Sequence, residues 1–109
     1  MPDSRIVRAR LARLLKALSH PTRIWVLEEL ARSGERCVCE LAQMSGTDDS
    51  TMSRHLTQLR VAGLVVDERR GTQVYCRLAG PQVAALLECA LSIVGEDRVV
   101  THHEWLGVC

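Results

Sequence analysis

The sequence of 109 residues has very few aromatic side chains: no Phe, one Tyr and two Trp. Leu, Val and Ala must therefore supply most of the core, and a core this thin favours a dimer that completes its burial at a subunit interface. Apolar residues make up 47% of the chain and charged residues 25%. This composition predicts a folded chain rather than disorder, and the length predicts a single domain over residues 1–109.

Long apolar runs are also absent, and no stretch approaches the roughly 20 residues that a membrane-spanning helix needs. The N-terminal segment is rich in Arg, but its apolar residues alternate with charges, whereas a signal peptide needs an unbroken apolar stretch. We therefore expect a cytoplasmic protein with no membrane partner. The sequence shows no nucleophile–base set, phosphate loop or cofactor motif, which argues against an enzyme.

Charge of one sign is not in large excess, since the net charge is only +1. The distribution of charge along the chain is more informative. Residues 1–36 carry eight basic and four acidic side chains, whereas residues 81–109 carry one basic and four acidic side chains. Almost all of the cations are Arg, the side chain that forks onto phosphates and guanines. This pattern gives weak support for a nucleic-acid partner.

Apolar residues recur at helical spacing in five segments, and two short runs have the composition of strands. The expected helices comprise one through residues 11–18, one from Pro21 to about Arg32, one over roughly 39–44, one from an N-cap at Asp48 to Ala62, and one carrying apolar residues 83–94. The expected strands are residues 64–66 and 74–78, with a hairpin loop over 67–73. We predict a mainly α fold (α+β): a winged helix-turn-helix of about five helices and a two-stranded β-hairpin wing.

The fourth expected helix has the pattern of a DNA-reading helix. Met52, Leu56 and Leu59 lie on one side of it, and Ser50, Arg54, Thr57 and Gln58 lie on the other. Small hydroxyls and a single Arg suit close approach to base edges and phosphates; the alternative is an ordinary solvated face. His55 lies nearer the apolar flank, which favours a core or rim histidine. Arg69 and Arg70 in the expected hairpin loop could reach neighbouring phosphates.

Five cysteines occur, at positions 37, 39, 76, 89 and 109. In a cytosolic chain they should be mostly reduced, and the odd count argues against a disulfide scaffold. Cys37 and Cys39 diverge in a regular helix but lie on one side of an extended or frayed helix start. A helix N-terminus next to Arg36 should lower a thiol pKa. We expect a ligand-binding pair here; the alternative is one buried and one incidental cysteine.

Four segments in order carry a family resemblance: residues 17–23 (ALSHPTR), 37–41 (CVCEL), 53–56 (SRHL) and 59–65 (LRVAGLV). Together they resemble the ArsR (ArsR/SmtB) family of metal-responsive repressors over about residues 10–80. The resemblance implies a homodimer with the first and last helices at its interface. It also implies binding of double-stranded operator DNA without inducer, and release when inducer binds.

By the same resemblance, the recognition helix carries the candidate DNA-binding residues Ser50, Thr51, Ser53 and Arg54. Asp49 stands where the family commonly has Gln. A carboxylate there repels phosphate and accepts only from cytosine, so the departure affects which operator is read.

Closely similar family members sense arsenic and antimony and have a third cysteine at the position of Ala42. Our leading hypothesis is therefore a repressor induced by As(III) or Sb(III), with metal ligands Cys37, Cys39 and, from the tail 95–109, Cys109. The tail is either flexible or contributes this ligand. Cys76 and Cys89 fall in apolar patterns typical of packing. We also expect that closing the pair on an ion deforms the third helix.

Two alternatives remain at this point. The inducer is Cd(II), Pb(II) or Zn(II), with His102, His103 and Glu104 of the tail as further candidate ligands. Alternatively, the two cysteines bridge, and the protein is a thiol-based redox or persulfide sensor.

Overall fold

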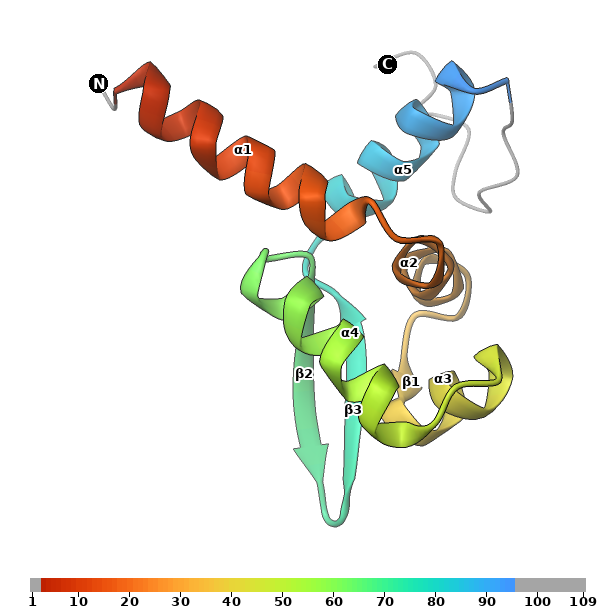
Figure 1. Ribbon diagram of the computed structural model, residues 1–109. Helices are drawn as coiled ribbons and strands as arrows, with labels where there is room; N and C mark the ends of the chain where they lie inside the picture. Colours follow the sequence, from red (N-terminus) through yellow and green to blue (C-terminus); the bar gives the residue numbers. More distant parts are fainter. Residues whose placement is uncertain (1–2, 96–109) are drawn as a thin grey trace.

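A computed structural model of the chain describes residues 3–95 and shows helices gathered above a projecting hairpin (Figure 1). The elements in chain order are α1 (Ser4–Leu18), α2 (Pro21–Ser33), β1 (Arg36–Cys37), α3 (Val38–Ser45), α4 (Asp49–Val61), β2 (Val65–Arg70), β3 (Gln73–Leu78) and α5 (Pro81–Ile93). This arrangement is the predicted winged helix-turn-helix, so the expected fold class is confirmed.

Local sequence signals fix the ends of the helices. Pro21 occupies the first turn of α2, where its missing N–H needs no partner. Asp48 is the N-cap of α4, and its carboxylate accepts a hydrogen bond from the Thr51 amide at 2.7 Å. Gly63 follows the end of α4 with a φ of 83°, the left-handed conformation in which glycine is favoured. Both of these α4 boundaries were expected from the sequence.

The sheet has three antiparallel strands in the order β1-β3-β2. The predicted loop over residues 67–73 is wrong, because Asp67 to Arg70 continue the β2 ladder and leave a two-residue turn at 71–72. Gly71, with a φ of 65°, permits that tight turn. The added strand β1 pairs Arg36 with Cys76 and Cys37 with Tyr75, so the chain entering α3 is attached to the wing.

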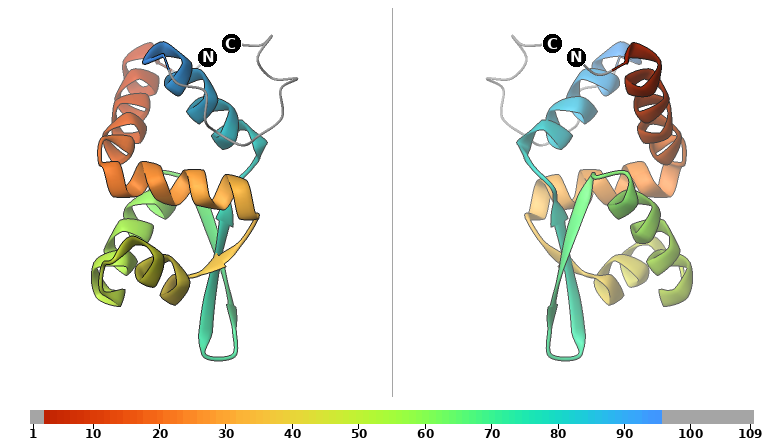
Figure 2. Two further views of the ribbon diagram at one scale, coloured as in Figure 1. Left: turned by 90° about the vertical axis from the view of Figure 1, so that its right-hand side faces the viewer. Right: turned by 90° about the vertical axis from the view of Figure 1, so that its left-hand side faces the viewer.

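The core lies where α2, α3 and α4 meet the base of the sheet. Its fully buried side chains are Leu27, Leu30, Leu41, Met52, Leu59, Val26 and Cys76. Helices α1 and α5 extend from this core on the side opposite the wing (Figure 2), and Figure 1 shows them diverging as two arms. Large apolar side chains on the arms remain exposed, namely Ile6, Val7, Leu11 and Leu15 on α1, and Ile93 and Val94 beside the end of α5. The thin core anticipated from the composition therefore leaves apolar surface on both arms.

None of the helices within residues 3–95 is long and apolar enough to cross a membrane.

Candidate DNA-binding face and cysteine pair

Helices α3 and α4 form the helix-turn-helix. The turn between them is closed by Gly46, which has a φ of 76°, and by the Thr47 amide, which donates to the Ala42 carbonyl at 3.0 Å. Leu41 and Met52 are fully buried in the same core cluster, which holds α3 and α4 together. The packing leaves the opposite face of α4 toward solvent, where it can meet another molecule.

That outer face of α4 is small and polar. Ser50, Ser53 and Arg54 are exposed and Thr51 is half-buried, so the four residues expected to contact DNA lie together on the first two turns. Arg54 donates only to the Thr51 hydroxyl, at 3.3 Å, and forms no ion pair with a carboxylate in residues 3–95. Its guanidinium therefore keeps donors and charge for a ligand.

His55 joins α4 to α2 instead of facing outward. Its Nδ1 accepts a hydrogen bond from Arg23 Nε at 3.1 Å, and its ring meets the His20 ring edge-on at a centroid distance of 4.4 Å. Burial lowers the pKa of His55, and the nearby positive charges of His20, Arg23 and Arg54 lower it further. The prediction of a packed rim histidine is confirmed.

The two wing arginines differ in whether their charges are neutralised by ion pairs. Arg70 forms ion pairs with Glu35 and with Glu68 (3.0 Å), and its guanidinium lies 4.6 Å from the centroid of the Tyr75 ring. Arg69 is exposed and has no ion-pair partner within the described part of the chain. Of the two candidates, Arg69 is the one whose charge remains unneutralised.

Cys37 and Cys39 converge at the beginning of α3. Cys37 is the extended N-cap residue, with φ −80° and ψ 158°, and Cys39 lies in the first helical turn. Their Sγ atoms are 2.6 Å apart, both thiols are free, and only Cys39 is exposed. This geometry confirms the expected convergence at a helix start. The two sulfurs meet beside a regular α3 without an ion, and the expected deformation of α3 on ligand binding stays a prediction.

The electrostatics around the pair also differ from expectation. The shared hydrogen bond with Cys37 raises the pKa of Cys39, and burial raises it further, so the predicted lowering does not hold for this thiol. The guanidinium of Arg36, from which the lowering was expected, is bound to Glu29 at 2.9 Å and to Glu40 at 3.4 Å. The Glu40 carboxylate in turn accepts from the Cys37 amide at 2.8 Å.

No third metal ligand completes the pair within residues 3–95, where no group of three His, Cys, Asp or Glu side chains could hold an ion. Cys76 is 1% exposed, and burial raises its pKa to about 11, helped by Asp67 and Cys37; this confirms the packing prediction. Cys89 is partly buried on α5. The expected ligand Cys109 and the tail residues 102–104 lie outside the described residues.

One neighbour of the pair was missed by sequence reasoning. The Cys39 thiol donates to Gln73 Oε1 at 3.5 Å, which connects the pair to the first residue of β3. No sequence signal could have shown this contact, because the two residues are 34 positions apart. The contact, together with the β1–β3 pairing, places the cysteine pair where α3 and the wing meet.

Comparison with known proteins places the chain among bacterial transcriptional regulators. Residues 20–66 match the family described as "Bacterial regulatory protein, arsR family". The chain is 40% identical over 94 residues to the arsenic resistance transcriptional regulator ArsR1 of Pseudomonas putida, covering 86% of this chain and 70% of that protein. It is 36% identical over 98 residues to the transcriptional repressor SmtB of Mycobacterium tuberculosis, covering 90% and 72%.

Among solved structures, the homodimeric winged helix-turn-helix DNA-binding domain of a possible ArsR-family regulator from Mycobacterium bovis superposes with a TM-score of 0.81. The two chains are 33% identical, and 94% of each is covered. These relatives are transcriptional regulators and not enzymes, as the sequence led us to expect.

Proposed function

Because this chain belongs to the ArsR family of bacterial transcriptional regulators, we propose that it represses by binding operator DNA as a homodimer and is released by As(III) or Sb(III). The observation that carries the proposal is the convergence of the Cys37 and Cys39 sulfurs, 2.6 Å apart, at the start of α3. Soft, thiophilic ions take thiolate ligands. The pair is therefore an inducer site attached directly to the helix-turn-helix.

On the DNA side, α4 enters the major groove of the operator and the wing lies beside it. Ser50, Thr51, Ser53 and Arg54 make the contacts from α4, and Arg69 with Arg70 makes those from the wing. Within residues 3–95 Arg54 has no carboxylate partner, which supports its role because its donors remain available for a guanine edge or a phosphate. Arg54→Ala should weaken specific binding by about 1–3 kcal/mol.

The dimer is supported by the apolar side chains left uncovered on the two arms. Ile6, Leu15 and Ile93 are about half or more exposed, and a second copy would bury them. Two recognition helices related by a two-fold axis require a palindromic operator, and their combined phosphate contacts make binding fall steeply with salt. A monomer that binds DNA as tightly as the dimer would contradict the proposal.

Induction begins with the loss of the Cys37 and Cys39 protons, because only thiolates bind the ion and each ligand thiol releases a proton. The pair supplies two sulfurs of the three that a trivalent metalloid takes, and Cys109 is our candidate for the third. Cys37 is the N-cap of α3, so a ligand that draws this residue toward a third sulfur changes how α3 packs on α4. Release then reflects the tighter binding of inducer to the altered shape.

The test is a release assay with labelled operator duplex against As(III), Sb(III), Cd(II), Pb(II) and Zn(II) in buffer free of small thiols. Cys37→Ser and Cys39→Ser should bind DNA normally and no longer respond. Cys109→Ser should lose the response, whereas Cys76→Ser, which alters a buried packing cysteine, should keep it. A Cys37→Ser/Cys39→Ser variant that still releases DNA with arsenite would remove the site from this segment.

The closeness of the two sulfurs also favours a second candidate function, a thiol-based redox sensor. In that case the Cys37 and Cys39 thiols lose two protons and two electrons to an oxidant such as a peroxide and form a disulfide. The two candidates differ in one measurement. A redox switch stays on DNA when metal ions are added under reducing conditions, and it is released by peroxide alone.

A further inference from the structure

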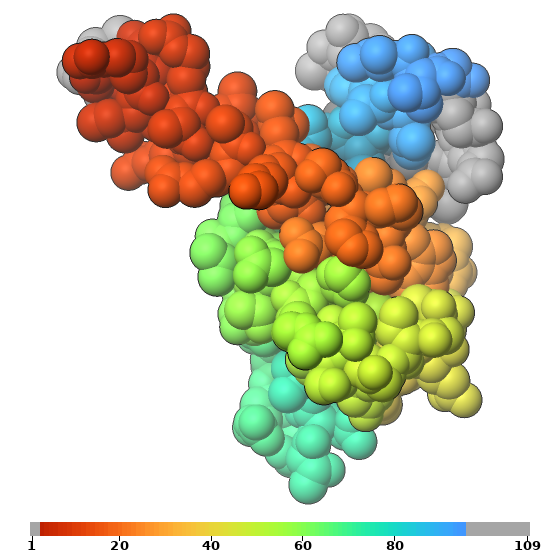
Figure 3. Space-filling view, viewed as in Figure 1, coloured from red at the N-terminus to blue at the C-terminus, as the bar shows by residue number. Residues whose placement is uncertain are grey.

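Two hollows meet on the side of the molecule that carries the outer face of α4. One, of about 1010 Å³, lies between α1, the start of α2 and the C-terminal end of α4. The other, of about 530 Å³, lies over the start of α2 and the first turns of α4. Both are lined by His20, Arg23 and Gln58, so they form one continuous groove from α4 to α1. Figure 3 shows the molecule hollowed in the angle between α1 and α4.

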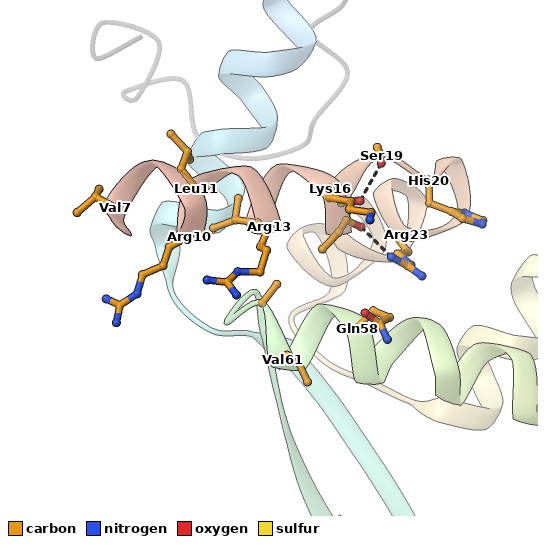
Figure 4. Close-up of a pocket in the computed structure, with 13 residues that line it drawn as sticks. Val7, Arg10, Leu11, Arg13, Lys16, Ser19, His20, Arg23, Gln58 and Val61 are labelled. Carbon is orange, nitrogen blue, oxygen red and sulfur yellow. Dashed lines mark hydrogen bonds between the residues drawn. The ribbon is translucent and has the colours of Figure 1, made fainter. Parts of the chain in front are cut away.

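Among residues 3–95, the groove, called here the α1–α4 groove, is lined by cations and by apolar side chains, and no carboxylate belongs to its lining. Its cations are Arg10, Arg13 and Lys16 from α1, Arg23 from α2, and Arg54 from α4. Figure 4 shows Arg10 and Arg13 extending from α1 on the side where Gln58 and Val61 of α4 lie.

These cations also differ from most others in having no ion pairs. Within residues 3–95, no carboxylate lies within ion-pair distance of any of the five. Elsewhere on the surface, Arg32, Arg36, Arg60 and Arg70 are each neutralised by at least one acidic side chain. Even Arg60, on α4 itself, pairs with Asp67 at 2.9 Å. The groove therefore concentrates unneutralised positive charge.

Arg23 stands at the junction of the two hollows and is held in place. Its Nε donates to His55 Nδ1 at 3.1 Å and its Nη1 donates to the Ala17 carbonyl at 3.3 Å. These bonds fix the guanidinium between α1 and α4 and leave Nη2 without a hydrogen-bond acceptor in the described part of the chain. A charge held in one orientation loses less entropy on binding an anion than a freely moving one.

We infer that the α1–α4 groove binds the phosphate backbone of DNA, so that the DNA contact runs from α4 past Arg23 to the cations of α1. The inference rests on the proposed DNA binding and extends it. Two observations favour DNA as the occupant: the groove is continuous with the reading face of α4, and its charge is unneutralised along its whole length. Arg10, Arg13 and Lys16 span about 9 Å along α1, enough to face two or three successive phosphates of one strand.

Phosphate contacts carry no sequence information, which makes the inference testable apart from operator reading. The variants are Arg13→Gln and Lys16→Gln, and the matched control is Arg8→Gln, which removes the same charge from α1 outside the groove. The probes are a duplex selected by the wild-type protein from a random pool and a shuffled duplex of equal length. Binding is measured by fluorescence anisotropy between 50 and 200 mM salt, and the dimer is checked by sedimentation.

Each groove variant removes two phosphate contacts per dimer, so the slope of log K against log salt should fall by about 2 in magnitude. Over this salt range the wild-type protein should then lose about tenfold more affinity than the variant. The fractional loss of affinity should be equal for the two duplexes, and Arg8→Gln should leave the slope unchanged.

The inference would be overturned if Arg13→Gln and Lys16→Gln both kept the wild-type affinity and the wild-type slope of log K against log salt. If Arg54→Ala still weakened specific binding in the same assay, the proposed function would stand. Dissociation of the Arg13→Gln dimer without DNA would also overturn it, because the groove would then be a contact between subunits. Failure of every protein, wild type included, to bind either duplex would overturn the proposed function as well.

Discussion

The ion pairs of Glu29 with Arg32 and Arg36 yield a quantitative prediction about stability. Glu29 is 7% exposed and accepts hydrogen bonds from Arg32 at 3.1 and 2.6 Å and from Arg36 at 2.9 Å. Burial raises the pKa of Glu29, but the hydrogen bonds and charges of Arg32 and Arg36 outweigh burial and hold it below its usual value. Because Arg36 immediately precedes Cys37, this carboxylate also anchors the chain that enters the cysteine site.

Glu29→Gln removes the charge and keeps the shape of the side chain. Leaving a fully buried charge unpaired costs about 3–5 kcal/mol, but Arg32 is 48% exposed and Arg36 is 27% exposed, so water recovers part of this loss. We expect about 2 kcal/mol of destabilisation at pH 7, from the loss of charged hydrogen bonds. For a domain of this size the melting temperature should fall by roughly 10 °C.

The assay is urea unfolding at fixed protein concentration, with Glu68→Gln as the matched control. Glu68 also pairs with two arginines but is 51% exposed, so solvent screens its pairs and its loss should cost much less than that of Glu29. The contribution of Glu29 is present above the carboxyl pKa of the unfolded chain and is lost as the pH falls through the lower folded value. Equal costs for the two variants, or a Glu29→Gln difference that persists in strong acid, would show that the buried ion pairs of Glu29 do not stabilise the fold.

Three further predictions concern single residues. Since the folded state lowers the pKa of His55, stability should fall as the pH drops from about 6.5 through the lower folded value. His55→Gln should flatten urea midpoints measured from pH 5 to 7.5, and an unchanged slope would exclude this cause. Ala42 is 1% exposed and lies three residues after Cys39, so Ala42→Cys adds a sulfur on the same side of α3. It should lower the arsenite concentration for half-release of operator, and an unchanged midpoint would contradict this. Gly63→Ala should destabilise by about 1 kcal/mol in thermal melts through its φ of 83° alone, since no atom lies near the added methyl; an unchanged melting temperature would contradict it.

Much of the fold could be predicted because the deciding signals are local. Helix caps such as Asp48 and the glycine after α4 act within a few residues, and the buried stripe of α4 repeats with helical period. The length of strand β2 was underestimated because its residues from Asp67 onward are polar and exposed on both faces. They therefore lack the alternation of apolar and polar residues that marks a strand. Strand β1 is only two residues long, which is too short for any period.

The candidate site could be predicted only where spacing along the chain decides the geometry. The pairing of Cys37 with Cys39 follows from their separation and from the helix start between them. The ion pairs around the site do not follow from spacing, because the partner of Arg36 is Glu29, seven positions earlier on α2. The hydrogen bond from Arg23 to His55 joins two helices 32 positions apart and has no signature in the sequence.

The structure connects the cysteine pair to both elements that the proposal places on DNA. Cys37 is the N-cap of α3 and also pairs with Tyr75 of β3, and the Cys39 thiol donates its hydrogen to Gln73 Oε1. A thiolate has no hydrogen to donate. Deprotonation of Cys39, which ligand binding requires, therefore removes the bond to the wing whichever ion follows. Under the proposed induction mechanism, release of operator would therefore begin at β3 as well as at α3, because the proton lost by Cys39 is the one donated to Gln73.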